Sequence, residues 1–251
     1  MMEECIHRNW RGVVYNRRGH AGTSLLPEEY EEEEHFAKPF PVHADVEDMT
    51  AVIEHITKKY PRGRIVCVGF SLGSNLMVRY LGNSKSGCGA VAGVSVANGF
   101  DMVEGTKRLQ SKGDWDAIIT MKMKRLLVRH SEDLVKTRRM APEHVKEIVK
   151  SKSFREFDAI VMGHLYGYED VDEYYRENSC VHLLHDIEVP LLCLGDQDDP
   201  LLTQELLRSS LDAGKVNRHI ITALTRNGGH LGWIEGWTGR PWMSRVIGEY
   251  I

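Results

Sequence analysis

Covalent acyl transfer is the chemistry that the residues around Ser71 could support. Ser71 lies at the centre of the pentapeptide Gly69-Phe70-Ser71-Leu72-Gly73, which has the pattern G-x-S-x-G. This pattern is typical of a sharp turn between a strand and a helix, where the serine oxygen is pushed out above a sheet. A serine in that position is predicted to be a nucleophile if a general base can reach it. We expect Gly69 and Gly73 to be required, because a side chain at either position would collide with the tight backbone.

The general base that we predict is His230, in the Gly-rich segment of residues 227–233. Two glycines allow this loop to fold back, so that the imidazole can lie over the serine. His230 would then remove the hydroxyl proton and later return it to the leaving group. Two other histidines are weaker candidates. His20 lies in a glycine turn typical of a solvated residue, and His43 makes an H-x4-D spacing with Asp48 that helix capping explains.

Three acids compete for the place beside the imidazole, where a carboxylate holds the tautomer and stabilises the imidazolium. They are Asp196, Asp198 and Asp199, at the exit of an apolar run that ends at Gly195. We choose Asp198 because it lies three residues past that glycine, and because Asp199 before Pro200 is typical of a turn residue. Asp199 is the alternative.

The elements that must position these residues follow from the spacing of apolar side chains. Continuous apolar runs at 65–68, 90–97 and 189–194 predict strands buried on both faces, and shorter runs predict strands at 13–15 and 218–224. Helical spacing recurs at 42–60 and 72–81, and a turn is expected at 212–215. The result is an α/β fold with a mostly parallel sheet. Ser71, Asp198 and His230 then end three different strands, in the chain order of an α/β-hydrolase.

No further strand is predicted from Asp101 to about Ile187, where the sequence is charged and has helical spacing. We interpret this segment as a cap or lid insertion within a single domain of residues 1–251. Its methionines and leucines could line an acyl pocket, but ordinary helix packing is the favoured explanation. A basic group in the same segment fits either a solvated helix face or contact with an anionic membrane surface. Its members are Lys122, Lys124, Arg125 and Arg129.

Composition excludes several other classes of function. The 251 residues carry a net charge of -4, from 32 basic and 36 acidic side chains, so no nucleic-acid partner is predicted. The sequence has neither an apolar run of about 20 residues nor a secretory signal at its start, and we therefore expect a cytoplasmic protein as written. Five cysteines without a C-x-x-C pair predict reduced thiols, with Cys67 and Cys193 in core strands. No cofactor or metal site is predicted.

The sequence resembles the AB hydrolase 4 family of α/β-hydrolase-domain lipases and esterases from Trp10 onward. The turn that carries Ser71, called the elbow below, is specific only to the superfamily. The cap segment together with the Asp-Asp-Pro turn at 198–200 is far more specific. The residues that carry the resemblance are Val13 to Gly19, Gly69 to Asn75, Phe154 to Asp158, Gly167-Tyr168, Tyr174-Tyr175-Arg176, Asp198-Asp199-Pro200 and Gly228-Gly229-His230.

This resemblance implies a serine hydrolase that cleaves carboxylic esters of short- or medium-chain lipids, acylglycerols or phospholipids. Some relatives run the same acyl-enzyme chemistry as alcohol acyltransferases, which gives a first alternative. Whether water or an alcohol accepts the acyl group depends on the shape of the pocket and on water exclusion. The predicted partner is therefore a small-molecule or lipid ester.

Members of the family usually begin with a membrane anchor and early strands, including a His-Gly or Pro-Gly loop that precedes the first segment seen here. We therefore expect an N-terminally truncated hydrolase, whose relatives associate with membranes through the absent anchor. The backbone N–H of Leu72 would supply one donor of the oxyanion hole, and the absent loop would supply the second. A second alternative is thus a catalytically impaired, hydrolase-like binding protein.

Overall fold

A computed structural model describes residues 1–25, 46–137, 139–237 and 239–251. The chain divides into two compact units, and each is described by itself. The first unit contains 1–15, 46–100 and 179–251, and the second contains the described part of 16–45 together with 101–178. Among the described helices, none is both long and apolar enough to cross a membrane. His43 lies outside the described residues, as does the start of the helix expected at 42–60.

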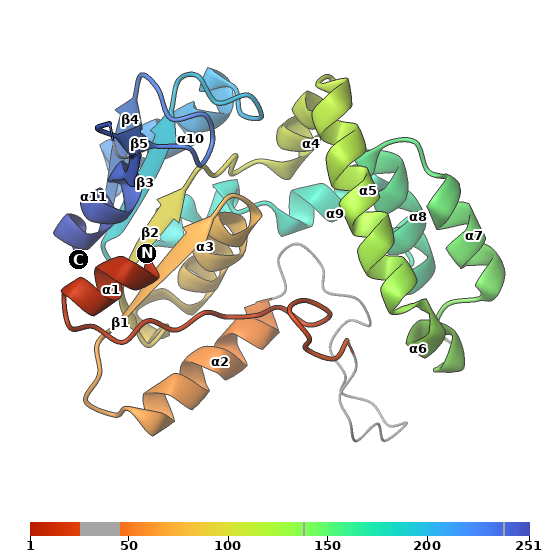
Figure 1. The fold of residues 1–251 in the computed structure, drawn as a ribbon, viewed down its shortest axis with the longest axis horizontal. Coiled ribbons are helices and arrows are strands. Elements are labelled where there is room, and N and C mark those ends of the chain that lie inside the picture. The colour runs from red at the N-terminus through yellow and green to blue at the C-terminus, as the bar shows by residue number, and fades with distance from the viewer. Residues whose placement is uncertain (26–45, 138, 238) are drawn as a thin grey trace. The chain divides into compact units, whose positions relative to one another are not determined.

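A four-stranded parallel sheet forms the centre of the first unit (Figure 1). Its strands are β1 (Ile65–Phe70), β2 (Ala90–Val96), β3 (Leu191–Asp196) and β4 (Ile220–Thr225), and they are arranged in the order β1-β2-β3-β4. The predicted α/β class with a mostly parallel sheet is confirmed. Because all four strands run the same way, their carboxyl ends lie at one edge of the sheet. The segments that follow β1, β3 and β4 therefore meet at that edge.

Three helices cover one face of this sheet: α2 (Val46–Lys59), α3 (Leu72–Ser84) and α10 (Gln204–Val216). Met49 and Ile53 of α2 and Met77 and Leu81 of α3 are buried in one apolar cluster with residues of the strands, and Ala213 of α10 packs against it. Their spacing of three or four residues places each set on the face of its helix that meets the sheet. The 3₁₀-helices η1 (Lys85–Gly87) and η2 (Val181–Asp186) complete this side.

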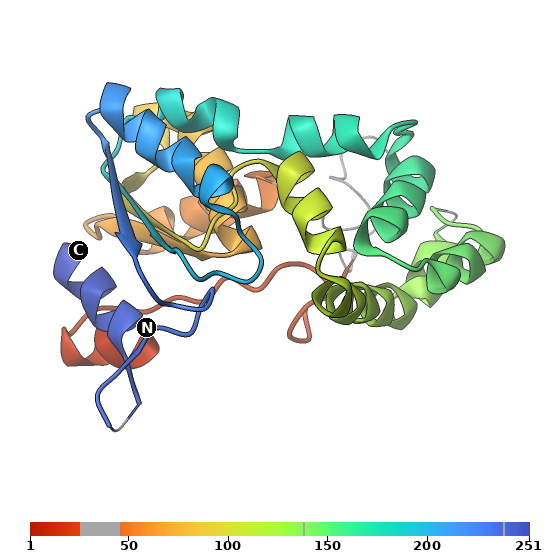
Figure 2. The same ribbon diagram turned by 90° about the horizontal axis from the view of Figure 1, so that it is seen from above.

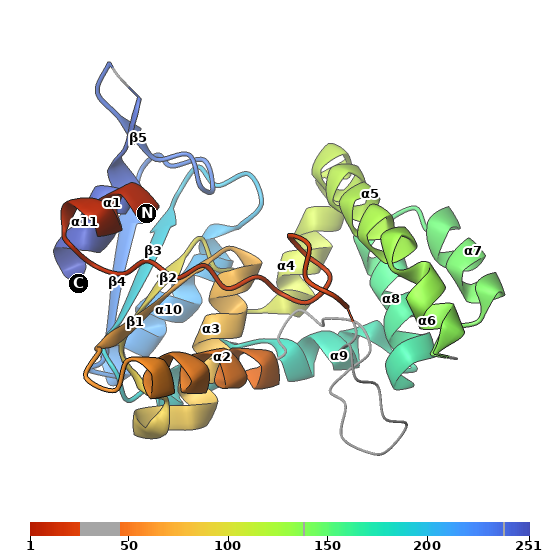
Figure 3. The same ribbon diagram turned by 60° about the horizontal axis from the view of Figure 1, so that its bottom comes forward.

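The opposite face of the sheet is covered by the two ends of the chain (Figure 2). Helices α1 (Met2–His7) and α11 (Trp242–Tyr250) lie side by side there (Figure 3), and the Met1 ammonium donates to Ser244 Oγ at 3.0 Å. Val94, Val96, Leu192, Leu194, Trp233 and Ile247 form the apolar cluster on this side. A short hairpin, β5 (Ile234–Glu235) with β6 (Arg240–Pro241), precedes α11.

The second unit is helical throughout its described elements. It contains α4 (Met102–Gln110), α5 (Gly113–Arg129), α6 (Ser131–Lys136), α7 (Pro142–Lys150), α8 (Phe154–Tyr166) and α9 (Val171–Asn178). Local capping explains two of the helix starts, because Asp101 accepts from the N–H groups of Val103 and Glu104 and Ser153 accepts from that of Glu156. Four aromatic residues of the segment predicted as a cap are buried within the unit: Phe154, Phe157, Tyr174 and Tyr175.

Two local predictions from the sequence are wrong. Residues 13–15 form no strand, and Val13 and Val14 are 54% and 66% exposed, because no described segment pairs with them. The turn expected at 212–215 is instead the last turn of α10. Gly214 is tolerated there, although glycine is a weak helix former. The glycine turn beside His20 is present in the second unit, with Gly19 and Gly22 at positive φ.

The cysteines are all free thiols in the structure, and four of the five are buried. As predicted, Cys67 and Cys193 lie in core strands, β1 and β3. Burial, with a smaller effect of Cys88, raises the pKa of Cys67 to about 12, and burial raises that of Cys193 further above its ordinary value. Thiols held in the protonated form are poor nucleophiles. These cysteines therefore serve packing.

Candidate active site

Ser71 occupies the turn between β1 and α3, as the pentapeptide predicts. Its backbone has φ of 50° and ψ of -121°, a conformation that residues with a side chain rarely adopt. The N–H of Ser71 donates to the carbonyl of Val96 at 2.9 Å, and the Ser71 carbonyl accepts from the N–H of Ser74 at 2.9 Å. These bonds to the end of β2 and to the first turn of α3 fix the strained residue in place.

The side chain of Ser74 connects this elbow to β2 by hydrogen bonds. Its hydroxyl is fully buried, lies 2.6 Å from the carbonyl oxygen of Gly69 and 2.8 Å from that of Val96, and accepts from the Val96 N–H at 2.9 Å. One small side chain therefore satisfies backbone groups of both strands next to Ser71. The sequence gives no signal for this role, because an isolated serine shortly after a strand has many explanations.

The two glycines of the elbow differ. A Cβ at Gly69 would lie 2.6 Å from both the Gly73 carbonyl oxygen and the Ser74 Cα, so a side chain is excluded there. A Cβ at Gly73 would meet no described atom within 4 Å. The expected collision at Gly73 is therefore wrong, because this residue already belongs to α3 and its Cβ would point away from the turn.

His230 lies within hydrogen-bond distance of the serine. Its Nε2 is 2.9 Å from Ser71 Oγ, although 159 positions separate the two residues in the chain. The loop between β4 and β5 brings it there with positive φ at both Gly229 (56°) and His230 (73°). Glycine adopts this conformation without strain, which explains the value of the Gly-rich segment. The structure thus brings Ser71 and His230 together.

Asp199, and not Asp198, is the acid beside the imidazole. Asp199 Oδ2 lies 2.7 Å from His230 Nδ1, and its carboxyl is only 1% exposed. Its other oxygen accepts from the N–H groups of Leu201 and Leu202 at 2.7 and 3.0 Å. An Nδ1–H that donates to this carboxylate leaves Nε2 unprotonated, which is the tautomer that can accept the serine proton.

Asp198, the acid that the sequence favours, accepts hydrogen bonds from the loop that carries His230. Its side chain is exposed and accepts from the backbone N–H groups of Gly228 and Gly229 at 2.8 and 2.9 Å and from Asn227 Nδ2 at 3.0 Å. The Gly229 N–H, followed by the Asn227 amide, lowers the pKa of Asp198 well below its ordinary value. The difference from the prediction has a physical reason. Because β3 continues to Asp196, beyond the predicted end of the strand, the turn begins later in the chain and Asp199 takes the position expected for Asp198.

Leu72, the predicted oxyanion-hole donor, begins α3 and directly follows Ser71. The first N–H groups of a helix have no partner inside it and carry the positive end of the helix dipole. The start of α3 is therefore a favourable environment for negative charge. Of the other candidates, His20 contacts the Arg18 carbonyl through Nδ1 at 3.1 Å, and Asp48 lies in the first turn of α2.

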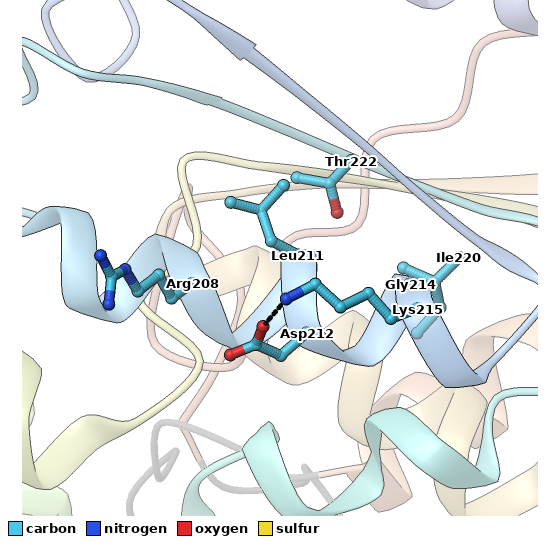
Figure 4. Close-up of a pocket in the computed structure, with 7 residues that line it drawn as sticks. All are labelled: Arg208, Leu211, Asp212, Gly214, Lys215, Ile220 and Thr222. Atoms are coloured by element: carbon cyan, nitrogen blue, oxygen red, sulfur yellow. Dashed lines mark hydrogen bonds and ion pairs between the residues drawn. The ribbon is translucent and has the colours of Figure 1, made fainter.

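A separate hollow of about 600 Å³ lies between α10 and β4 (Figure 4). Lys215 Nζ and Asp212 Oδ1 form an ion pair in it at 2.6 Å. Its lining shares no residue with the Ser71 site: Arg208, Leu211, Asp212, Gly214, Lys215, Ile220 and Thr222. Within the described part of the chain, no cluster of histidine, cysteine or acidic side chains is placed to hold a metal ion.

Comparison with known proteins agrees with this fold. A family model described as alpha/beta hydrolase fold matches residues 1–236. The chain therefore belongs to the α/β-hydrolase fold family, and the superfamily resemblance of its sequence is confirmed.

Among curated relatives, a monoacylglycerol lipase ABHD2 of Danio rerio is 31% identical over 214 residues, which cover 81% of this chain and 51% of that protein. The protein of the same name from Homo sapiens is 30% identical and covers 80% and 50%, respectively. The embryogenesis-associated protein EMB8 of Picea glauca is 26% identical, over 100% of this chain and 53% of its own. The chain thus spans about half the length of the curated relatives that it matches. Among solved structures, the Pyrococcus furiosus esterase Pf2001 has a TM-score of 0.49 at 17% identity, over 82% of this chain and 60% of its own.

Proposed function

We propose that this chain carries the catalytic machinery of a serine ester hydrolase, with Ser71 as nucleophile, His230 as general base and Asp199 as the acid that orients the base. One observation supports this most directly. Ser71 Oγ, the His230 ring and the Asp199 carboxyl are connected by contacts of 2.9 and 2.7 Å at the carboxyl edge of a parallel sheet. Nucleophile, base and orienting acid in hydrogen-bond reach are the arrangement that acyl transfer requires.

In the proposed reaction, His230 Nε2 takes the proton of Ser71 as Oγ attacks the carbonyl carbon of the ester. The buried Asp199 carboxylate stabilises the imidazolium that forms. The backbone N–H of Leu72 faces the developing oxyanion. The imidazolium then protonates the leaving alcohol, and an acyl-enzyme remains on Ser71. Water attacks that ester in the second half, with His230 acting again as base and acid.

For the substrate we propose carboxylic esters of the acylglycerol class. The support is that curated relatives bear the name monoacylglycerol lipase. The family is defined by the fold, and one fold hosts many acyl substrates. The acyl chain and head group are therefore the variables to be measured.

Labelling with a fluorophosphonate probe tests the proposal. We expect covalent labelling of the wild-type chain and turnover of a nitrophenyl butyrate ester, with both lost in Ser71→Ala. Ser111→Ala is the matched control, because Ser111 is an exposed serine whose hydroxyl donates to the Arg108 carbonyl of its own helix end. Equal labelling of Ser71→Ala and wild type, or no labelling of a chain whose circular dichroism shows it folded, would contradict the proposed function.

A further inference from the structure

Asp196 is a buried acid beneath the loop that carries His230, and the proposed reaction does not use it. It is the last residue of β3, pairs in register with Thr225 of β4 and is fully buried. The loop packs tightly against it, because a Cβ at Gly228 would lie 2.8 Å from the Asp196 Cβ. The same point lies 2.4 Å from the Trp233 ring. Gly228 is thus enclosed by Asp196 and Trp233.

Neither carboxyl oxygen of Asp196 has a hydrogen-bond partner among the described residues. A buried carboxylate without partners is strongly disfavoured relative to the neutral acid. The nearby Asp198 carboxyl, followed by the negative charges of Asp199 and Asp198, disfavours the ionised form of Asp196, while the backbone N–H of His230 favours it. Burial first, and then its proximity to Asp198 and Asp199, raise the pKa of Asp196 to about 7.

The three acids of this turn therefore have different surroundings. Asp198 is held ionised by the N–H groups of Gly228 and Gly229, and Asp199 contacts the imidazole. Asp196 makes no hydrogen bond of ordinary geometry among the described residues; it packs against Gly228 and Trp233, near the carboxyl of Asp198 and the backbone N–H of His230. A neutral Asp196 is compatible with two neighbouring carboxylates. An ionised Asp196 adds a third negative charge directly under the loop and draws water into the packed contact.

We propose that Asp196 is a positioning residue, whose neutral carboxyl supports the loop at Gly228 and whose ionisation loosens that loop and withdraws His230 from Ser71. This inference rests on the proposed function for its effect on rate, and on the packing at Gly228 for its effect on the loop. No group other than a proton is exchanged, and solvent accepts it.

The expected consequence is a rate that falls on the alkaline side of neutrality. His230 must be unprotonated to act as base, so the rate of Ser71 acylation rises with pH at first. Once Asp196 ionises, the rate falls by about tenfold per pH unit. Asparagine has nearly the same shape and cannot ionise. Asp196→Asn is therefore expected to keep the acid limb of the profile and to stay level, within about twofold, on the alkaline side.

The test measures the rate of fluorophosphonate labelling between about pH 6 and pH 9 for wild type, Asp196→Asn and Asp212→Asn. Asp212 is an exposed acid of α10 and serves as the matched control that should keep the alkaline fall. If Asp196→Asn does not fold, Asp196→Ser supplies a second neutral side chain. An alkaline fall that is lost only in the Asp196 variant supports the inference, and superimposable profiles overturn it.

Hydrogen exchange separates this inference from the proposed function. Protection of the backbone amides of 226–233, corrected for intrinsic rates, is expected to decrease above neutral pH in wild type and to remain constant in Asp196→Asn. If no variant is ever labelled at Ser71, the proposed function fails, and the exchange result still decides the role of Asp196. Equal protection in the two proteins at every pH overturns the inference.

Discussion

The elbow at Ser71 and the loop at His230 each place one atom of the contact between Ser71 Oγ and His230 Nε2, but they are held in different ways. The elbow is fixed by residues of its own short segment and by the end of β2, through the buried bonds of Ser71 and Ser74. The histidine loop is held by Asp198 and Asp199, which follow a different strand, β3, and it packs against Asp196 at the end of that strand. Geometry that is encoded locally can be read from a sequence. Geometry that depends on a distant turn requires the structure.

The largest effect is expected at the acid that contacts the imidazole. Asp199→Asn should lower turnover of a nitrophenyl ester by about 10⁴-fold, because the imidazole loses the tautomer and the stabilised cation. Asp198→Asn is the matched variant on the same turn. It should cost no more than about 10²-fold, through a displaced loop. Steady-state kinetics of the two proteins decide between the acids. A larger loss of turnover in Asp198→Asn would show that Asp198, and not Asp199, orients the His230 imidazole.

The next largest effect is on the free energy of unfolding, where the two elbow glycines are expected to differ. Gly69→Ala should destabilise the fold by about 3 kcal/mol, since its Cβ would overlap backbone atoms of Gly73 and Ser74 that cannot move freely. Gly73→Ala should stabilise it by about 0.5 kcal/mol, because alanine is the better helix former. Urea unfolding midpoints measure both. Similar midpoints for the two variants would show that the elbow is less tightly packed than its geometry indicates.

Ser74→Ala should cost about 2 kcal/mol, because it leaves buried backbone groups of Gly69 and Val96 without their partner. Ser210→Ala is the control, since Ser210 is equally buried but donates only to the Leu207 carbonyl of its own helix. We expect about 0.5 kcal/mol there. Thermal or urea unfolding checks the pair, and an equal loss in both would indicate that the hydroxyl of Ser74 has no special role.

The smallest effect is expected at Asp198 and concerns acid stability. Its folded-state pKa lies below the ordinary value, because the N–H groups of the histidine loop favour the ionised form. The stability that it contributes is present above about pH 4 and is lost as the pH falls through the folded pKa. Asp198→Asn should therefore unfold with a shallower acid dependence than wild type. Parallel acid-unfolding curves would rule this out.

The sequence predicted the sheet strands at β1, β2, β3 and β4, the elbow, and the pairing of Ser71 with His230, because apolar runs and glycines encode them locally. It failed at residues 13–15, where an apolar β-branched run has the composition of a strand but no described neighbour to pair with. It also chose Asp198 over Asp199. Adjacent side chains of a turn point in different directions, and one residue of uncertainty in the end of β3 is enough to exchange them.

The strained backbone of Ser71 also bears on how the protein can be assayed. In an unfolded chain, nothing holds the φ of Ser71 at 50° or keeps Ser71 next to His230, which lies 159 positions away in the chain. On the proposed function, a reactive serine therefore exists only in molecules whose sheet is assembled. A covalent serine probe would therefore label only native molecules. The labelled fraction during denaturation would report the fraction of the protein that is folded.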